Sequence, residues 1–301
     1  MELQIPTPRR LRFRRHRFGK PTFVLQERDH EIIRLVGNYR FITSEEIQAL
    51  ISGSDQTILR RLQKLYHAGY LDRPRSQRLR GNTKMIYALG NKGAHLVATL
   101  LGIEPSKGDW AEKNRQVGVR HLEHTLMVSR FRATVTFAAK LSGQVSVESW
   151  LQGQEIQDQV TVEHRDWTER IPVHPDGYFV LRLPDEPAGS NRIHVFLEAD
   201  RGTMTTKRFV KKMLGYWHYW RSGKQEERFD MKNFLVLTVT RTAERTANLV
   251  AATRVLDAPN HRGLRMFLFG SEQTFGLSEP ERILEPIWVT AQDNGRHSLL
   301  E

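Results

Sequence analysis

The sequence contains no cysteine among its 301 residues. Disulfide bonds, thiol nucleophiles and cysteine-ligated zinc are therefore excluded. It also lacks an apolar run approaching the roughly 20 residues that span a bilayer, and its basic N-terminus is not followed by the apolar stretch of a signal peptide. We therefore expect a cytoplasmic protein with no membrane partner.

Several catalytic motifs are missing as well. The sequence has no Gly-rich phosphate loop and no GxSxG elbow, which leaves ATPase and serine hydrolase functions without support. His121 and His124 are three residues apart, which is not the HExxH spacing of a zinc protease. We expect no small-molecule cofactor.

The net charge of +12 comes from two segments in which acidic residues are scarce. Residues 1–20 hold seven Lys and Arg against one Glu, and residues 55–84 hold eight against two Asp. Charge gathered in this way is typical of a protein that binds a polyanion. The alternative is a solvated basic surface with a disordered tail.

Residues 27–90 have the pattern of three helices followed by a hairpin. The first helix, over 27–36, is expected to end at Gly37 and Asn38, a good C-terminal signal. Thr43 and Glu46 have the spacing of a capping box at the start of the second. The third runs from 54 to 68.

That third helix places Ile58, Leu62 and Leu65 on one apolar stripe. Two strands are expected near residues 70–71 and 85–89, joined by a basic loop that is too polar to be core. Three helices and a hairpin with a basic tip are typical of a winged helix-turn-helix, in which the third helix enters the major groove and the wing contacts phosphates or the minor groove.

Double-stranded DNA is therefore the expected partner. The predicted contacts face away from the apolar stripe of the third helix, lie on the wing or belong to the N-terminal arm: Gln56, Thr57, Arg60, Arg61, Lys64, Arg75, Arg78, Arg80, Arg12, Arg14 and Arg15. Two alternatives stay open, since a winged helix can dock proteins and an Arg-rich arm can contact RNA. A helix over 91–101 either packs on this module or pairs with a second copy in a homodimer.

The domain boundaries follow from these patterns. We predict a basic arm over 1–22, a winged helix over 23–104, a linker over 105–116, an α/β domain over 117–285 and a tail over 286–301. The α/β domain should hold helices over 117–141, 203–222 and 242–255, and strands over 144–150, 170–183, 192–200, 234–240 and 264–269. The fold class is thus α+β overall, with one mixed sheet covered by helices.

Two carboxylates end the strand over 192–200, in the stretch HVFLEADRG. Side chains alternate along a strand, so Glu198 and Asp200 share one face. Asp176 opens the preceding strand, and if the two strands form a hairpin it meets Glu198. Converging carboxylates suit Mg²⁺ or Mn²⁺, and Glu123 is a further candidate ligand. The alternative is that Asp176 serves a turn and the other two pair with nearby cations.

Six segments resemble the replication-relaxation family of plasmid and mobile-element proteins. These are ERDHEIIRLVGNYRFITSEEIQAL, RRLQKLYHAGYLDR, IYALGNKGA, RHLEHTLMVSRFR, PDGYFVLRL and FLEADRGT. The resemblance implies a winged helix joined to a domain similar to the PD-(D/E)xK nucleases, which are restriction-endonuclease-like, and a role in plasmid replication or in relaxing plasmid DNA. It implies that Asp176 matches the PD element and Glu198 the acidic position.

The sequence departs from that pattern at the lysine, because Asp200 stands where Lys is expected. Either Arg201, Lys207 or Lys211 replaces it, or the domain has kept the fold without the chemistry. The helix over 203–222 carries a basic ridge that could bring a lysine near the carboxylates, or that is solvated or faces DNA: Lys207, Arg208, Lys211 and Lys212. The residue patterns and the resemblance together give a candidate catalytic set of Asp176, Glu198, Asp200 and Lys207, with Asp176, Glu198, Asp200 and Glu123 as metal ligands. Two hypotheses follow: a nucleoid- or plasmid-associated DNA nickase, and a noncatalytic regulator whose C-terminal domain dimerises or recruits partners.

Overall fold

The computed structural model describes residues 24–80, 84–104, 108–163, 165–257 and 262–301, together with residues 13 and 15. The chain divides into two compact units, Met1–Ser129 and Arg130–Glu301, which are described separately below. The division falls inside the long helix α6 (Val119–Ser142). Residues 105–116, predicted to be a linker, include the short helix α5 (Trp110–Gln116).

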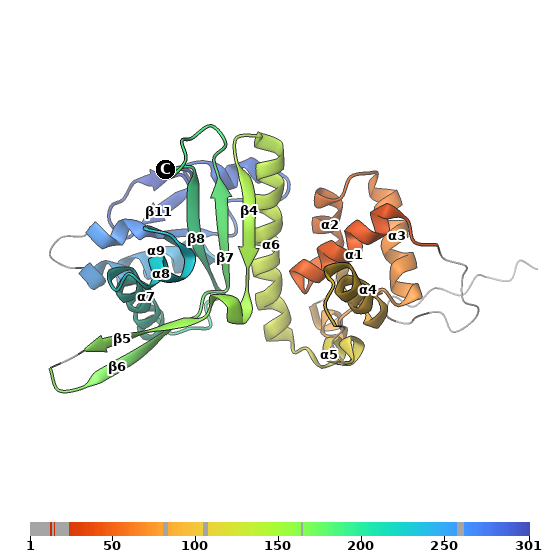
Figure 1. Ribbon diagram of the computed structural model, residues 1–301, viewed down its shortest axis with the longest axis horizontal. Helices are drawn as coiled ribbons and strands as arrows, with labels where there is room; N and C mark the ends of the chain where they lie inside the picture. Colours follow the sequence, from red (N-terminus) through yellow and green to blue (C-terminus); the bar gives the residue numbers. More distant parts are fainter. Residues whose placement is uncertain are drawn as a thin grey trace, which may run out of the picture. The chain divides into compact units, whose positions relative to one another are not determined.

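Unit 1 is mainly helical (Figure 1), and its strands form a small antiparallel sheet. Its elements before α5 are α1 (Glu27–Tyr39), β1 (Ile42–Thr43), α2 (Ser44–Leu50), α3 (Asp55–Ala68), β2 (Leu71–Asp72), β3 (Ile86–Leu89) and α4 (Asn91–Leu101). The strand order is β1-β3-β2, so β3 lies in the middle.

Local sequence signals set most helix ends in unit 1. The predicted capping box of α2 is present: the Glu46 backbone N–H donates to Thr43 Oγ1 and the Thr43 N–H donates to Glu46 Oε2. Ser54 caps α3, and Gly69 ends it in the left-handed conformation, with φ +88°.

The predicted end of α1 is wrong. The helix continues through Gly37 to Tyr39, which is buried. Gly37 lies against the side chains of Leu89 and Val97, so this glycine permits close packing and does not end the helix. Tertiary packing here overrides a local stop signal.

The core of unit 1 confirms the predicted apolar stripe of α3. Ile58, Leu62 and Leu65 are fully buried. Ile32 and Ile33 of α1 are equally buried. The core therefore fixes which face of α3 is left for solvent.

Unit 2 is built on one mixed sheet of seven strands, ordered β12-β11-β10-β9-β8-β7-β4. The strands of unit 2, in that sheet and in a separate hairpin of β5 and β6, are β4 (Ser146–Leu151), β5 (Asp158–Glu163), β6 (Thr168–Val173), β7 (Gly177–Arg182), β8 (Arg192–Asp200), β9 (Leu235–Thr240), β10 (Phe267–Ser271), β11 (Trp288–Thr290) and β12 (Arg296–His297). Strands β8, β9 and β10 run parallel, and the other neighbours are antiparallel. These features confirm the α+β class and the mixed sheet.

Three predicted strand assignments need correction. The single strand predicted over 170–183 is two strands, β6 and β7, separated at the Pro-Asp turn. The sequence prediction also missed β5, which pairs with β6 in a separate two-stranded hairpin. Residues 286–301, predicted to be a tail, supply β11 and β12 and extend the main sheet.

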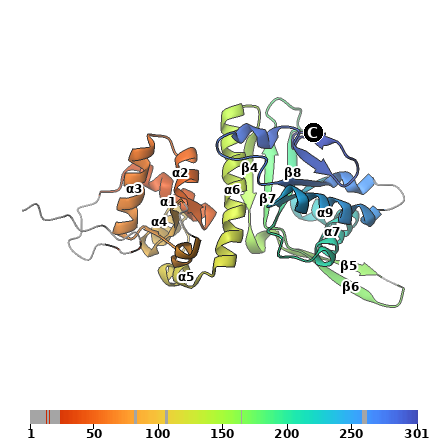
Figure 2. The same ribbon diagram turned by 180° about the vertical axis from the view of Figure 1, so that it is seen from behind.

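The two faces of the sheet are covered by different helices. On one face, α7 (Thr206–Arg221) and α9 (Ala243–Thr253) pack on Phe196, Val236 and Phe269. On the other, Phe131 of α6 contacts the rings of Phe179 and Trp288. Figure 2 shows α7 and α9 from behind. The short α8 (Lys224–Phe229) follows α7.

Among the described helices, none combines the length and apolar character needed to cross a membrane.

Candidate functional site

Glu198 is the centre of a buried polar cluster near the C-terminal end of β8. Glu198 is 4% exposed. One carboxylate oxygen accepts a hydrogen bond from the Tyr216 hydroxyl, and the other forms an ion pair with the Lys212 ammonium. Lys212 and Tyr216 are four residues apart on α7, so one turn of this helix presents both groups to the carboxylate.

Asp176 lies beside this cluster, immediately before β7. Strands β7 and β8 pair antiparallel with Gly177 opposite Leu197, which confirms the predicted hairpin. Continuing that register by one residue places Asp176 opposite Glu198. Asp176 Oδ2 accepts a hydrogen bond of 2.8 Å from the backbone N–H of Ala199, which holds the carboxylate at the edge of the cluster.

The electrostatics of the cluster are dominated by burial. Burial raises the pKa of Glu198 to about 7, and the neighbouring Asp176 charge adds to this shift while Lys212 opposes it. Burial alone would lower the pKa of Lys212, but the attraction of Glu198 and Asp176 outweighs it and the pKa is raised. Lys212 is therefore a stable cation, and its side chain is 20% exposed.

Asp200 shares a sheet face with Glu198, as alternation predicts, but it is held by a different helix. Arg245 of α9 donates to both of its carboxylate oxygens, each at 2.9 Å. The Gly202 N–H donates to Asp200 Oδ1 at 2.7 Å. The prediction of Asp200 as a ligand therefore places a metal on a carboxylate that is already paired with a guanidinium.

Lys212, which the sequence reasoning assigned to a basic ridge, is the lysine that contacts Glu198. Lys207 is exposed on α7, and Lys211 pairs with Glu169. Arg201 lies in the segment that follows β8. A usable signal was present, since Lys212 falls one turn before Tyr216 and next to the buried Met213.

The metal prediction can be compared with the available ligands. Among the described residues, no group of three or more His, Asp or Glu side chains is placed to hold a metal ion. Mg²⁺ commonly binds through one or two carboxylates and keeps several waters. Asp176 and Glu198 are two carboxylates at one strand end, but both Glu198 oxygens are engaged, one by Lys212 and the other by Tyr216. Glu123 lies on the part of α6 that belongs to unit 1.

In unit 1, the solvent-facing side of α3 carries most of the predicted DNA contacts of that helix. Gln56, Arg60 and Lys64 are exposed. Thr57 is partly buried and its hydroxyl accepts a hydrogen bond from Ser54 Oγ at 2.9 Å.

The predicted orientation of Arg61 is wrong. This residue is 7% exposed, and its Nε donates to Asp29 Oδ1 at 2.7 Å. A second contact joins the Arg61 guanidinium to the other Asp29 oxygen. The position next to Leu62 turns the side chain inward, and the buried carboxylate of α1 neutralises it.

The predicted wing is partly buried, although it was expected to be too polar for the core. Residues Arg75–Arg80 form a 3₁₀ helix in which Gln77 is buried. The Gln77 amide donates to the Lys84 carbonyl and accepts from the Ile86 N–H, so part of the loop belongs to the core. Arg75 is exposed, and the side chains of Arg78 and Arg80 lie outside the described part.

One residue of the N-terminal arm is tied to unit 1. The Arg15 guanidinium donates to the carbonyls of Tyr66 and Leu71, each at 3.0 Å, and pairs with Asp72. Arg12 and Arg14 lie outside the described residues. Arg15 thus fixes one point of the arm next to the C-terminal end of α3.

Comparison with known families identifies the family of the chain. The replication-relaxation family model matches residues 33–233, and the chain belongs to this family. Membership suggests a role in the replication or relaxation of plasmid or mobile-element DNA. No curated protein and no solved structure matches the chain.

Proposed function

We propose that the chain binds double-stranded DNA of a plasmid or other mobile element through unit 1, during replication or relaxation of that DNA. The main support for this proposal is the orientation of α3: its apolar stripe is buried, and Gln56, Arg60 and Lys64 face solvent. A guanidinium can pair with guanine, and an amide with adenine, in the major groove. The order of helices and strands in unit 1 supports the winged-helix assignment.

Arg75 and Arg15 are two further candidate contacts in unit 1. Arg75 lies on the 3₁₀ helix between β2 and β3, where a winged helix carries its phosphate contacts. Arg15 is held on the last turn of α3 and on β2. A protein with these contacts would act on the plasmid or nucleoid in the cytoplasm.

Salt dependence tests DNA binding directly. The full chain would be titrated against a labelled duplex and a labelled RNA of the same sequence, by fluorescence anisotropy. Phosphates neutralised by the protein release counterions. If the protein makes six or more phosphate contacts, raising the salt from about 50 to about 200 mM should therefore weaken duplex binding about a thousandfold or more. Absence of duplex binding at low salt contradicts the proposal, and tighter binding of the RNA favours an RNA-binding role.

We further propose that unit 2 cleaves one DNA strand at the cluster of Asp176, Glu198 and Lys212. The observation that favours this second activity is the presence of two adjacent carboxylates at the end of β8 and a partly buried lysine of α7 beside them. These are the residue types of the PD-(D/E)xK pattern, with the lysine supplied by α7. Bound Mg²⁺ or Mn²⁺ would supply a water of lowered pKa and neutralise charge on the phosphate.

The residues of the chain have distinct roles in this proposal. Asp176 and Glu198 would hold the ion, while the Lys212 ammonium stabilises negative charge on the phosphate as water adds and the sugar oxygen leaves with a proton. Tyr216 is a positioning residue, because its hydroxyl fixes one oxygen of Glu198.

Supercoiled plasmid gives the test of cleavage. With Mg²⁺ or Mn²⁺, the wild-type protein should produce nicked circles, and Lys212→Met and Glu198→Gln should abolish them while DNA binding persists. Lys232→Met, an exposed lysine of the same unit, serves as the matched control and should cleave like wild type. If Lys207→Met abolished cleavage and Lys212→Met did not, Lys207 and not Lys212 would be the lysine that acts in cleavage.

Intact plasmid in every wild-type reaction would contradict the cleavage proposal. The rival function is then a noncatalytic DNA-binding regulator whose unit 2 dimerises or recruits partners. In that case Asp176→Ala and Glu198→Gln would leave plasmid maintenance in cells unchanged, and the cluster would serve stability alone.

A further inference from the structure

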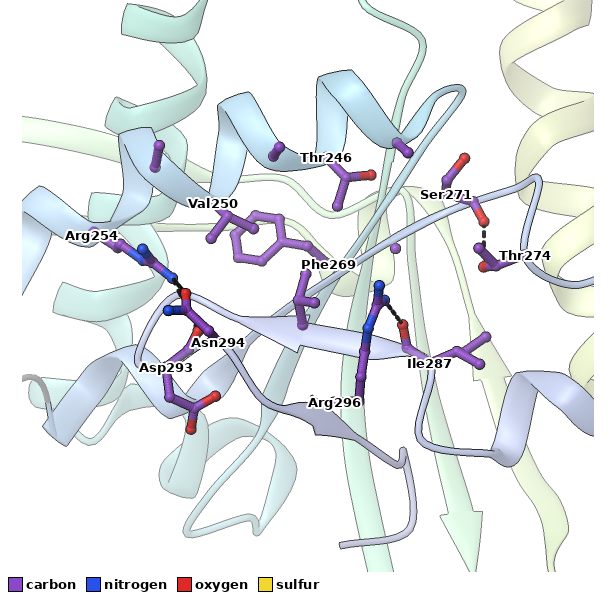
Figure 3. A pocket seen from close by; sticks show the side chains of 15 residues that line it. Thr246, Val250, Arg254, Phe269, Ser271, Thr274, Ile287, Asp293, Asn294 and Arg296 are labelled. Carbon is purple, nitrogen blue, oxygen red and sulfur yellow. Dashed lines mark hydrogen bonds between the residues drawn. The ribbon is translucent and has the colours of Figure 1, made fainter.

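A pocket in unit 2 and an exposed leucine in unit 1 have no part in the function proposed above. The pocket, of about 350 Å³, lies between α9 and the segment from β11 to β12 (Figure 3). Its guanidinium groups already donate to protein oxygens, Arg254 to the Asp293 carbonyl and Arg296 to the Ile287 carbonyl. The Phe269 ring beneath it is fully buried. These groups are used within the protein, so we infer no ligand there.

The exposed leucine is Leu59 of α3. It is 43% exposed, although its neighbour Ile58 is fully buried. Successive residues of a helix are rotated by about 100° around its axis, so Leu59 points away from the apolar stripe that Ile58 shares with Leu62 and Leu65. Every residue of α3 is described, and of its exposed side chains Leu59 alone is apolar.

Leu59 lies within the face of α3 that is proposed to contact DNA. Residues three and four apart are neighbours on a helix surface, so Leu59 lies between Gln56, three residues before it, and Gln63, four residues after it. The exposed Arg60 and Lys64 lie along the same face. A single exposed leucine is common on protein surfaces, but this one is surrounded by the side chains that suit base edges and phosphates.

The chemistry of the major groove offers one partner for such a side chain. Most groups on the base edges are hydrogen-bond donors or acceptors, and thymine adds a methyl group. A leucine pressed against a donor or acceptor would remove its water and leave it without a partner, which costs free energy. Against the methyl group it buries apolar surface on both sides, which is favourable.

We propose that Leu59 contacts the 5-methyl group of a thymine in the major groove, and that the preferred DNA site therefore contains a thymine close to the bases that Gln56 and Arg60 contact. This inference rests on the proposed DNA binding and adds a base preference to it. Because a leucine side chain is short, the contact also requires α3 to lie deep in the groove. Leu59 is thus a specificity-determining residue of unit 1.

Replacement of thymine by uracil tests the contact, because it removes the methyl group and keeps the hydrogen-bonding groups of the base. The full chain would be titrated by fluorescence anisotropy against a duplex selected by wild-type protein from a random pool. One thymine at a time is replaced by uracil. At one position at least, the replacement should weaken wild-type binding about fourfold, as expected for the loss of one buried methyl group.

Variants of the leucine assign the effect to α3. Leu59→Ala removes the contact, so it should bind the thymine and uracil duplexes with equal affinity. Leu101→Ala is the matched control, because Leu101 is an exposed leucine of α4, and it should keep the wild-type preference for thymine. Thermal unfolding checks each fold. Leu59→Gln, which keeps a good helix former at this position, gives the same comparison if Leu59→Ala is unfolded.

Two results would overturn the contact and leave the proposed DNA binding intact. They are wild-type binding that tolerates uracil at every position, and a thymine preference in Leu59→Ala equal to that of wild type. If Leu59→Ala kept that preference and lost self-association in analytical ultracentrifugation, Leu59 would belong to a protein contact instead. Absence of wild-type binding to any duplex at low salt would overturn both this inference and the proposed function.

Discussion

Arg61 of α3 donates from its Nε to Oδ1 of Asp29 on α1 across 2.7 Å, and both side chains are buried. Asp29 Oδ2 also accepts from the Gln26 N–H at 2.8 Å and so caps α1. This contact joins the N-terminal end of α1 to the helix proposed to read DNA. The neighbouring Arg60 faces solvent, so two adjacent arginines have different tasks.

The first prediction separates those tasks. Arg61→Met should lower the free energy of unfolding by about 3–5 kcal/mol, because it leaves the Asp29 carboxylate buried without its cation. Arg60→Met should change it by less than about 0.5 kcal/mol, as is usual for an exposed side chain. Urea unfolding followed by circular dichroism measures both. Equal effects of the two variants would mean that Arg61 is not part of the core.

The second prediction concerns Asp200 and Arg245. Arg245→Met should destabilise unit 2 by about 3 kcal/mol or more, since the Asp200 carboxylate stays buried. Adding Asp200→Asn should restore part of the loss. Arg241→Met is the matched control, because Arg241 is exposed and lies 3.9 Å from its partner Glu272. A double variant no more stable than Arg245→Met would argue against this pairing.

The third prediction is a pH dependence caused by Glu198. Its pKa in the folded protein is raised to about 7, so between the unfolded value of about 4.3 and about 7 the folded state binds more protons. Stability contributed by this group is therefore full at low pH and falls as pH rises through that window, by at most about 3 to 4 kcal/mol. Glu198→Gln should remove this component.

Unfolding free energies of wild type and Glu198→Gln, measured from about pH 5 to about pH 8, test the sign. The wild type should lose stability relative to the variant as pH rises. A constant difference between the two proteins would show that Glu198 does not take up a proton on folding in this range.

Local rules predicted the parts of the fold that depend on near neighbours. The spacing of Thr43 and Glu46 predicted a capping box, and alternation along β8 placed Glu198 and Asp200 on one face. The hairpin of β7 and β8 followed from short-range pairing, and it brought Asp176 to Glu198. The capping box and the shared face are encoded within a few residues, and the hairpin depends on two strands that follow one another in the chain.

Long-range partners explain what the sequence did not predict. Arg61 is buried because Asp29, far away in the chain, neutralises it. Lys212 was predicted to belong to a basic ridge; its place one turn before Tyr216 indicates an inward-facing side chain, but only the folded chain shows that its partner is Glu198. Strands β11 and β12 were missed because the pairing of β11 with β10, and of β12 with β11, depends on the assembled sheet.

The most direct test of the central claim compares DNA binding by Arg60→Gln and Arg34→Gln. Both remove an exposed arginine of unit 1, one from α3 and one from α1. Anisotropy titrations would use a duplex selected by wild-type protein from a random pool, and a random duplex. Arg60→Gln should lose about 1–3 kcal/mol of binding free energy on the selected duplex and less on the random duplex, while Arg34→Gln should bind both like wild type. Wild-type binding by Arg60→Gln, or equal loss on both duplexes, would contradict recognition of DNA through α3.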